Sequence, residues 1–204
     1  MARDRAVLAV AGVVGAALLF STSGTTQALL APEAWPPSVA AVRLLVGAMG
    51  MVAYVAWRGL GPQSWALLRR PLVWLMAVGV AGYQAFFFVG VHVAGVATGT
   101  LVALGSAPFL AGLLGWVVGE GAPGWVWSGA TAIGIAGLVL LTGSGDAALV
   151  GVLAALAAAA SYAIYTVFGA RLARTGHDPS AVLAAAFSLG AVVLLPFLTA
   201  AGWV

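Results

Sequence analysis

Two groups of polar side chains stand inside the long apolar runs of this sequence, where they could contact a solute. Ser21 and Thr25 are spaced i, i+4 and therefore share one face of a helix. Ser161, Tyr162 and Tyr165 form a similar polar strip in a later run. Hydroxyl and phenol groups donate and accept hydrogen bonds, so both strips predict reversible solute binding along one central pathway. Interhelical hydrogen bonding, at about 0.6 kcal/mol per contact, stays open as the alternative.

Arg43 is a basic residue inside an apolar run. It lies about five residues from the end of that run, which is roughly 8 Å at ~1.5 Å per residue. An arginine at the centre of a membrane helix costs about 3 kcal/mol, although a side chain at this depth can still reach the interface. A structural role and a role in a solute pathway both stay open.

A third group of candidates, Tyr83 and Gln84, precedes three consecutive phenylalanines. Three successive rings point in different directions on a helix, so some of them must face lipid, and Gln84 is the better pathway candidate. Pro108 lacks a backbone N–H near the middle of its run and predicts a helix kink there. Gly95 and Gly99 precede it with the spacing of a small-residue packing ridge.

No group of residues in the sequence predicts catalysis. The chain has no Cys and no Lys, which excludes thiolate and Schiff-base chemistry and a phosphate-binding loop with its lysine. Ser106 does not stand in a nucleophile elbow, and His92 and His177 fall in predicted loops. Glu120 is expected to interact with the N-terminal dipole of the helix that follows it. We therefore expect no enzyme, no cofactor and no metal site.

The composition predicts a protein that is embedded in lipid. Of the 204 residues, 63% are hydrophobic and 6% are charged, and the mean hydropathy is +1.12. Soluble domains carry about 25% charged residues, so this chain lacks the polar surface that water requires. The basic residues are all arginines and are scattered between apolar runs, which argues against a nucleic-acid partner. The expected partners are the lipid bilayer and a small-molecule substrate, with a homo-oligomer possible.

Seven apolar segments are long enough to cross a bilayer, which takes about 20 residues. We therefore expect an all-α, polytopic transmembrane helical bundle. The third and fourth segments are separated only by a tight turn near His92. The predicted spans are Ala6–Leu30, Ser38–Trp57, Pro71–Val91, Val93–Val118, Trp125–Leu141, Ala148–Ala170 and Ser180–Ala200.

The positions of the arginines predict the orientation of these spans. With strict alternation, every arginine outside the spans falls on one side, which the positive-inside rule identifies as the cytoplasm. The N-terminus is then cytoplasmic, and the C-terminus of this chain is extracytoplasmic after seven crossings of the cell membrane. The arginines concerned are Arg3, Arg5, Arg58, Arg69, Arg70, Arg171 and Arg174.

An internal repeat is visible when the sequence is shifted by 142 positions. The shift sets Phe20 on Tyr162 and the pair Pro37-Ser38 on Pro179-Ser180. Each copy has a span, a short polar link that ends in Pro-Ser, and another span. The first copy begins with the first span and the second copy with the sixth, an offset of five spans. Because five is odd, the copies have opposite orientations across the membrane, as in many secondary transporters. We expect a first repeat over 1–142 and the start of a second over 148–204.

An ordered series of motifs runs along nearly the whole chain. It consists of Pro37–Leu45, Tyr83–Phe87, Gly99–Leu101, Ala107–Phe109, Gly119-Glu120, Trp127–Gly129, Gly134–Leu138, Ser161-Tyr162, Arg171–Arg174 and Asp178-Pro179. This series resembles EamA-type carriers of the drug/metabolite transporter superfamily. The resemblance implies a ten-helix carrier of two inverted five-helix repeats, with alternating access and export of small amphipathic solutes such as amino acids. Because the last three helices are absent, we expect this chain to be an incomplete carrier.

The alternative function is a seven-span membrane protein that does not transport, such as a receptor or an assembly subunit. A polar cavity between the first, third, fourth and sixth spans favours a carrier, whereas a dry bundle favours the alternative. A seven-span sugar carrier built from parallel repeats fits less well, because the repeat here is inverted.

Overall fold

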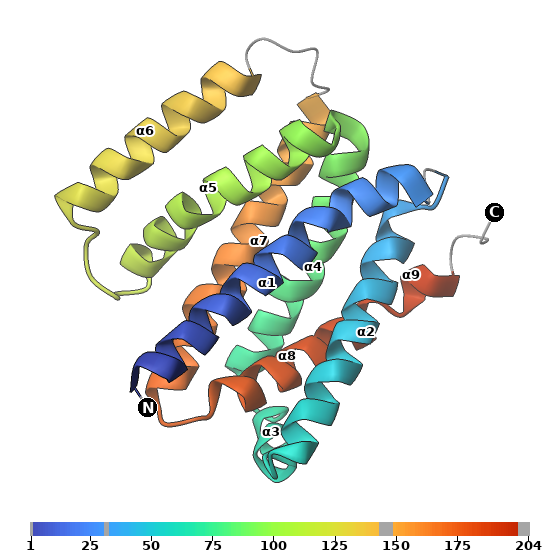
Figure 1. The fold of residues 1–204 in the computed structure, drawn as a ribbon, viewed down its shortest axis with the longest axis vertical. Helices are drawn as coiled ribbons and strands as arrows, with labels where there is room; N and C mark the ends of the chain where they lie inside the picture. Colours follow the sequence, from blue (N-terminus) through green and yellow to red (C-terminus); the bar gives the residue numbers. More distant parts are fainter. Residues whose placement is uncertain (1, 31–32, 143–148, 200–204) are drawn as a thin grey trace.

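The computed structural model describes residues 2–30, 33–142 and 149–199, and in these ranges the regular structure is entirely helical (Figure 1). The predicted all-helical fold is therefore confirmed. Seven of the helices coincide with the predicted spans, and two short helices were not predicted. In chain order they are α1 Ala2–Leu30, α2 Pro36–Trp57, α3 Gly61–Leu67, α4 Pro71–Ala94, α5 Val96–Val117, α6 Trp125–Thr142, α7 Leu149–Arg174, α8 Pro179–Leu194 and α9 Pro196–Thr199.

Four helices in the described ranges, α2, α4, α5 and α7, are long and apolar enough to cross a membrane, with a mean hydropathy of 1.7 to 1.9. The shorter ones have 22 residues, which at ~1.5 Å per residue gives about 33 Å and exceeds the ~30 Å hydrocarbon thickness of a bilayer. Large apolar side chains such as Val46, Met49 and Leu153 remain exposed along them. The protein is a multi-pass helical membrane protein.

The centre of the bundle is α4, which packs against α7, α8, α2 and α5. Small residues bring α4 and α7 together. A Cβ added at Gly90 would lie 3.0 Å from the backbone nitrogen of Ala155, and one added at Gly151 would lie 2.5 Å from that of Ala94. Close backbone approach of this kind is how membrane helices gain packing energy without a hydrophobic driving force.

A second core lies at the end of the bundle that carries α3, a short helix in the link between α2 and α4. Leu67 of α3 is buried beside Met76 of α4 and Val182 of α8. The hydroxyl of Ser64 donates a hydrogen bond to the carbonyl of Ala181 at 3.2 Å. These contacts tie the α2–α4 link to the start of α8.

Ion pairs gather at this same end of the bundle. Arg58, after α2, lies 3.5 Å from Asp178, before α8. Both Arg171 and Arg174 of α7 pair with Glu120 in the α5–α6 link. Glu120 thus has two arginines as partners, and its expected interaction with the start of α6, which begins at Trp125 after four intervening residues, stays a prediction. The three links share one end, as the predicted alternation requires.

Two predicted boundaries are shifted in the structure. The fourth helix runs through His92 to Ala94, and the break falls at Gly95, whose φ of +85° is accessible to glycine at little cost. The seventh predicted span is divided into α8 and α9 before Pro196, because proline cannot donate the helical hydrogen bond. α5 includes Pro108 within its length, and the predicted kink there stays a prediction.

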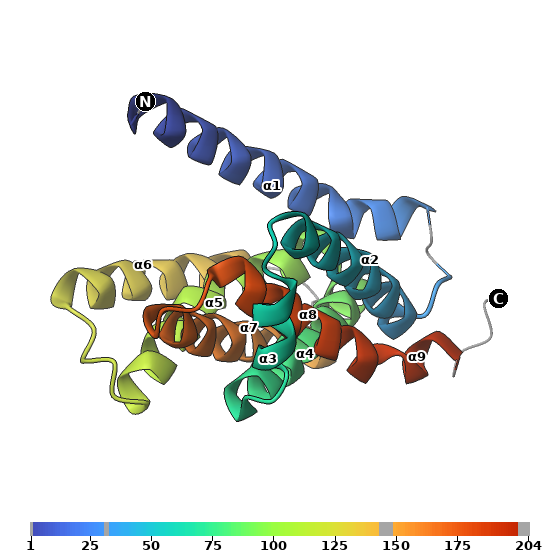
Figure 2. The same cartoon turned by 90° about the horizontal axis from the view of Figure 1, so that it is seen from below.

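α1 lies along one side of the bundle and packs only lightly on α5 and α4, as Figure 2 shows. Most of its described side chains are exposed, including Val10, Val13 and Leu19. Phe20 is one anchoring point, because its ring lies 5.7 Å from that of Phe87. The predicted division into repeats over 1–142 and 148–204 stays a prediction, and residues 143–148 lie outside the described ranges.

Candidate functional site

A cavity of about 660 Å³ lies between α1, α4, α5 and α7. These are the first, third, fourth and sixth of the predicted spans, so the cavity lies where the sequence predicts a pathway. Its wall is mostly apolar, with hydroxyl and phenol groups at five positions. The lining residues are Ala16, Ala17, Phe20, Ser21, Tyr83, Val96, Ala97, Thr100, Leu101, Leu104, Tyr162 and Tyr165.

Three tyrosines form one aromatic cluster on the α4–α7 side of the cavity. The ring of Tyr83 lies 5.5 Å from that of Tyr162 and 6.5 Å from that of Tyr165. The rings of Tyr162 and Tyr165 meet edge to face at 5.0 Å, which is the favoured arrangement for aromatic pairs. Tyr162 and Tyr165 are three residues apart and therefore project from one face of α7.

Glycines of α4 set the position of this cluster. A Cβ at Gly79 would lie 2.9 Å from the carbonyl oxygen of Ser161, and one at Gly82 would lie 2.8 Å from its hydroxyl oxygen. α7 therefore approaches α4 directly beside Tyr83, and the tyrosines of both helices converge. This close approach explains why Ser161 packs into the α4–α7 interface and does not line the cavity.

The opposite wall comes from α1 and α5. Phe20 and Ser21 contribute from α1, and Thr100, Leu101 and Leu104 contribute from α5. The hydroxyl of Ser21 donates to the carbonyl of Leu18 at 2.8 Å, so its oxygen keeps acceptor capacity for a further partner. Because α1 packs lightly, its part of this wall is held by fewer contacts than the α5 part or the tyrosine wall.

The arrangement can bind a solute. Among the described residues that line the cavity there is no acid, imidazole or thiol, and the described residues contain no cluster of three or more His, Asp or Glu side chains that could hold a metal. Aromatic faces and aliphatic side chains bind apolar bodies, and the hydroxyls can orient a polar group. Amphipathic solutes match this wall.

The structure brings together four of the predicted site residues, namely Ser21, Tyr83, Tyr162 and Tyr165, and leaves others outside the cavity. Thr25 is exposed one turn further along α1, and Gln84 is half-buried on α4. Because successive residues of a helix point about 100° apart, Gln84 cannot share the direction of Tyr83. Gln84 therefore does not line this cavity, and its role in a solute pathway stays a prediction.

Arg43 also lies outside the lining, on the α2 side of α4. Its guanidinium sits over the ring of the buried Phe88, 5.1 Å from the centroid. The ring of Phe88 lies 5.4 Å from that of Phe87, which lies 5.7 Å from the ring of Tyr83. Two phenylalanine rings thus connect Arg43 to the tyrosine cluster, although Arg43 does not line the cavity.

Sequence reasoning missed the residues of α5 and the ring of Phe20. Thr100 carries a hydroxyl one residue after Gly99, whose added Cβ would lie 2.8 Å from Gly90 and Val91. Glycine at this point brings α5 onto α4 and so places Thr100 beside Tyr83. A threonine next to a packing glycine was the available signal in the sequence.

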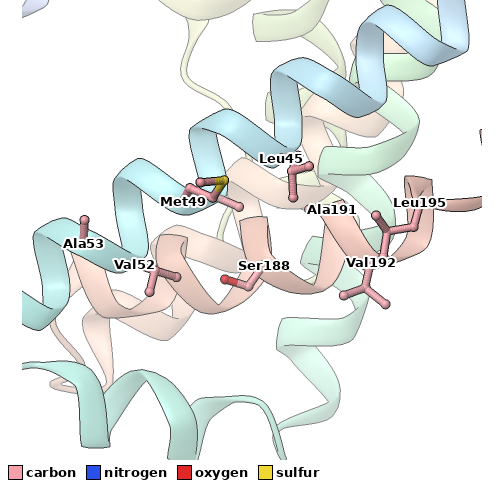
Figure 3. A pocket seen from close by; sticks show the side chains of 9 residues that line it. Leu45, Met49, Val52, Ala53, Ser188, Ala191, Val192 and Leu195 are labelled. Carbon is pink, nitrogen blue, oxygen red and sulfur yellow. The ribbon is translucent and has the colours of Figure 1, made fainter. Parts of the chain in front are cut away.

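A second hollow, of about 430 Å³, lies on the outside of α2 and α8 (Figure 3). Leu45, Met49 and Val52 of α2 line one side of it, and Val192 of α8 lines the other. The hydroxyl of Ser188 also lines this groove and donates to the carbonyl of Ala184 at 2.7 Å. The other lining side chains among the described residues are apolar, whereas the tyrosine-lined cavity has hydroxyl and phenol groups at five positions, so that cavity is the better candidate site.

One known protein matches the chain over most of its length. The sequence is 40% identical over 191 residues to a protein of Bacillus subtilis (strain 168) described as the uncharacterized transporter YwfM. The chain resembles a transporter. The match covers 91% of this chain and 63% of the Bacillus protein. No protein-family model matches the sequence, and no solved structure matches it.

Proposed function

We propose that this chain forms the solute-binding part of a membrane carrier for small amphipathic solutes. The observation that carries the proposal is the cavity between α1, α4, α5 and α7, which combines tyrosine and hydroxyl groups with an apolar wall. The similarity to the Bacillus transporter over 91% of the chain supports the same class of function. The helices that enclose the cavity include three of membrane-spanning length, so a solute bound there would lie within the bilayer.

The proposed transport cycle relies on a difference in packing between the walls of this cavity. α4 and α7 meet backbone to backbone and form a firm wall, whereas α1 is held by few contacts. Displacement of α1 opens the cavity, and its return encloses the solute. In an EamA-type carrier built from inverted repeats, such exposure alternates between the two sides of the membrane. Export is the direction that this resemblance implies.

Cysteine accessibility tests the pathway, because the chain has no native cysteine. We expect Thr100→Cys and Tyr165→Cys to react with a small, membrane-impermeant thiol reagent, because both side chains face the cavity. Ala158→Cys is the buried control, since Ala158 is 0% exposed in the core, and Ala66→Cys in α3 is the exposed control. If both cavity positions stay unreactive from either side while Ala66→Cys is labelled, the pathway is wrong.

A transport assay separates the carrier from a receptor or an assembly subunit. Vesicles that contain the purified protein are loaded with a mixture of labelled amino acids and aromatic acids, and efflux is followed over time. Saturable efflux that is lost in Tyr83→Ala supports the carrier. Labelling of the cavity without saturable efflux of any solute supports the alternative.

A further inference from the structure

Arg43 carries a charge toward the interior of the bundle. Its neighbours Val42 and Val46 are exposed on the outer surface of α2, whereas Leu44 is 1% exposed and faces the core. The guanidinium lies over Phe88, a ring that is 0% exposed, 5.1 Å from its centroid. Arg43 itself is half-buried. Its guanidinium therefore lies against the buried part of the bundle, while part of the side chain stays exposed.

A half-buried arginine in a membrane helix carries an energetic cost. An arginine at the centre of the helix costs about 2.5–3.5 kcal/mol on insertion scales, and one nearer the interface, such as Arg43, costs less. A cation–π contact returns about 0.5–2 kcal/mol, and less where the ring is phenylalanine. Arginine does not lose its proton in proteins, so it cannot reduce the cost by becoming neutral. A counter-charge would remove the remaining cost.

The described part of the chain supplies no such counter-charge. The five acidic residues all fall outside the apolar runs, and the ion pairs of the described residues involve Arg58, Arg171 and Arg174. No hydrogen bond from Arg43 is present within those ranges either. The partner of Arg43 must therefore come from another molecule or from outside the described ranges.

Two further features place a binding site on this side of the cavity. The Phe88 ring that Arg43 covers contacts Phe87, and the ring of Phe87 contacts that of Tyr83, which lines the cavity. Gln27 of α1 is 6% exposed, and both its amide nitrogen and its amide oxygen lack a partner among the described residues. Gln27 and Arg43 each lie within about 11 Å of the α1–α2 link along their helices. This half of the bundle thus holds two polar groups, the amide of Gln27 and the guanidinium of Arg43, that have no hydrogen-bond partner among the described residues.

We propose that Arg43 binds an anionic oxygen group, the carboxylate of the transported solute, while the apolar body of the solute occupies the tyrosine-lined cavity. The proposal rests on the proposed carrier function and narrows its substrates to amphipathic carboxylates. A guanidinium matches a carboxylate through two parallel hydrogen bonds, which a lysine at the same position would not reproduce.

A pair of probes that differ in charge tests this site. Phenylbutyrate and phenylbutyramide have the same shape, but only the first carries a carboxylate. The protein is placed in phosphatidylcholine nanodiscs at neutral pH and low chloride, and the midpoint of thermal unfolding is followed as each probe is added. We expect a saturable rise with phenylbutyrate at a concentration at least fivefold lower than with the amide.

Variants of Arg43 test whether this side chain causes the preference for phenylbutyrate over phenylbutyramide. Arg43→Gln and Arg43→Met should both lose the fivefold preference, and Arg43→Lys should keep part of it. Arg69→Gln is the matched control, because Arg69 is an exposed arginine in the α2–α4 link. A preference that survives in both neutral variants overturns the proposal, as does a wild-type protein without any preference.

A lipid headgroup can also supply an anionic oxygen group to Arg43. A second experiment distinguishes a lipid phosphate from the carboxylate of a solute. Nanodiscs with phosphatidylglycerol replace the pure phosphatidylcholine discs, and no probe is added. If phosphatidylglycerol raises the midpoint only when Arg43 is present and the probes show no preference, the anion is a lipid and the substrate assignment is overturned. Arg43-dependent probe binding without saturable transport would overturn the carrier proposal and leave this site standing. Transport that does not depend on Arg43 would overturn this site alone.

Discussion

The ring of Phe20 in α1 lies 5.7 Å from the ring of Phe87 in α4, tilted by 49°. This contact attaches a lightly packed helix to the centre of the bundle, and Phe20 also lines the cavity. An aromatic pair contributes about 0.5–1.5 kcal/mol beyond its buried area. The position of α1 relative to the cavity therefore depends in part on this ring contact, which mutation can remove.

Phe20→Ala should release α1 from the bundle. We expect thiol labelling of Tyr165→Cys to become several-fold faster in this background, because the α1 wall of the cavity is weakened. Val13→Ala is the control, since Val13 is 70% exposed on the same helix. Equal labelling rates in the two backgrounds would show that α1 does not limit access to the cavity.

Gly151→Ala should destabilise the protein. The added Cβ would lie 2.5 Å from the backbone nitrogen of Ala94, so the backbones of α4 and α7 must separate. Overpacking of this kind costs about 1–3 kcal/mol. Gly50→Ala is the opposite case: nothing lies within 4 Å of the new Cβ, and alanine favours a helix by about 1 kcal/mol over glycine. Thermal unfolding in detergent should show a lower midpoint for the first variant and an unchanged or higher one for the second.

Asp178 should make the stability of the α7–α8 link depend on acid pH. The hydrogen bond from the backbone N–H of Ser180 lowers the pKa of Asp178, and the charge of Arg58 lowers this pKa further. A carboxyl whose pKa is lower in the folded state stabilises the protein above its unfolded pKa of 3.8 and loses this effect as the pH falls further.

The measurement compares unfolding midpoints at pH 7 and pH 3 for the wild type, Asp178→Asn and Asp178→Ala. Asparagine keeps the N-cap and removes the charge, so its midpoint should depend less on pH than that of the wild type. Alanine also removes the cap and should have the lowest midpoint at pH 7. A wild type and an Asn variant with the same acid response would contradict the role of the carboxylate.

The orientation predicted from the arginines can be tested at two links. In intact cells, Ala66→Cys in α3 should not react with an impermeant thiol reagent, whereas Glu33→Cys in the α1–α2 link should react. Membrane vesicles turned inside out should give the reverse pattern. A reactive Ala66→Cys in intact cells would place the N-terminus outside the cytoplasm, against the positive-inside prediction.

The positions of the long helices could be read from the sequence, because membrane-length apolar runs leave few alternatives for the backbone. The four helices of the cavity and the tyrosines within it were also predictable, since Tyr83, Tyr162 and Tyr165 are among the few polar groups in those runs. Which of two adjacent residues lines the cavity could not be predicted from the sequence. Gln84 and Ser161 differ from Tyr83 and Tyr162 only by one helical step, and rotation about a helix axis is set by packing.

Contacts between segments that are distant in the sequence could not be predicted either. Glu120 pairs with Arg171 and Arg174 across a separation of about fifty residues, and no local pattern indicates that pairing. α3 is a seven-residue helix that owes its place to burial of Leu67 against α4 and α8. A segment this short has little helical stability of its own.

The glycine contacts between α4 and α7 have a mechanical consequence. Where backbone touches backbone, no side-chain rotamers are available to absorb a change of distance, so these two helices must move together as one rigid body. α4 comes from the first predicted repeat and α7 from the second. In the proposed carrier, this unit would therefore cross the predicted boundary between the repeats, and a motion that opens the cavity would divide the molecule along a different surface, between this pair and α1.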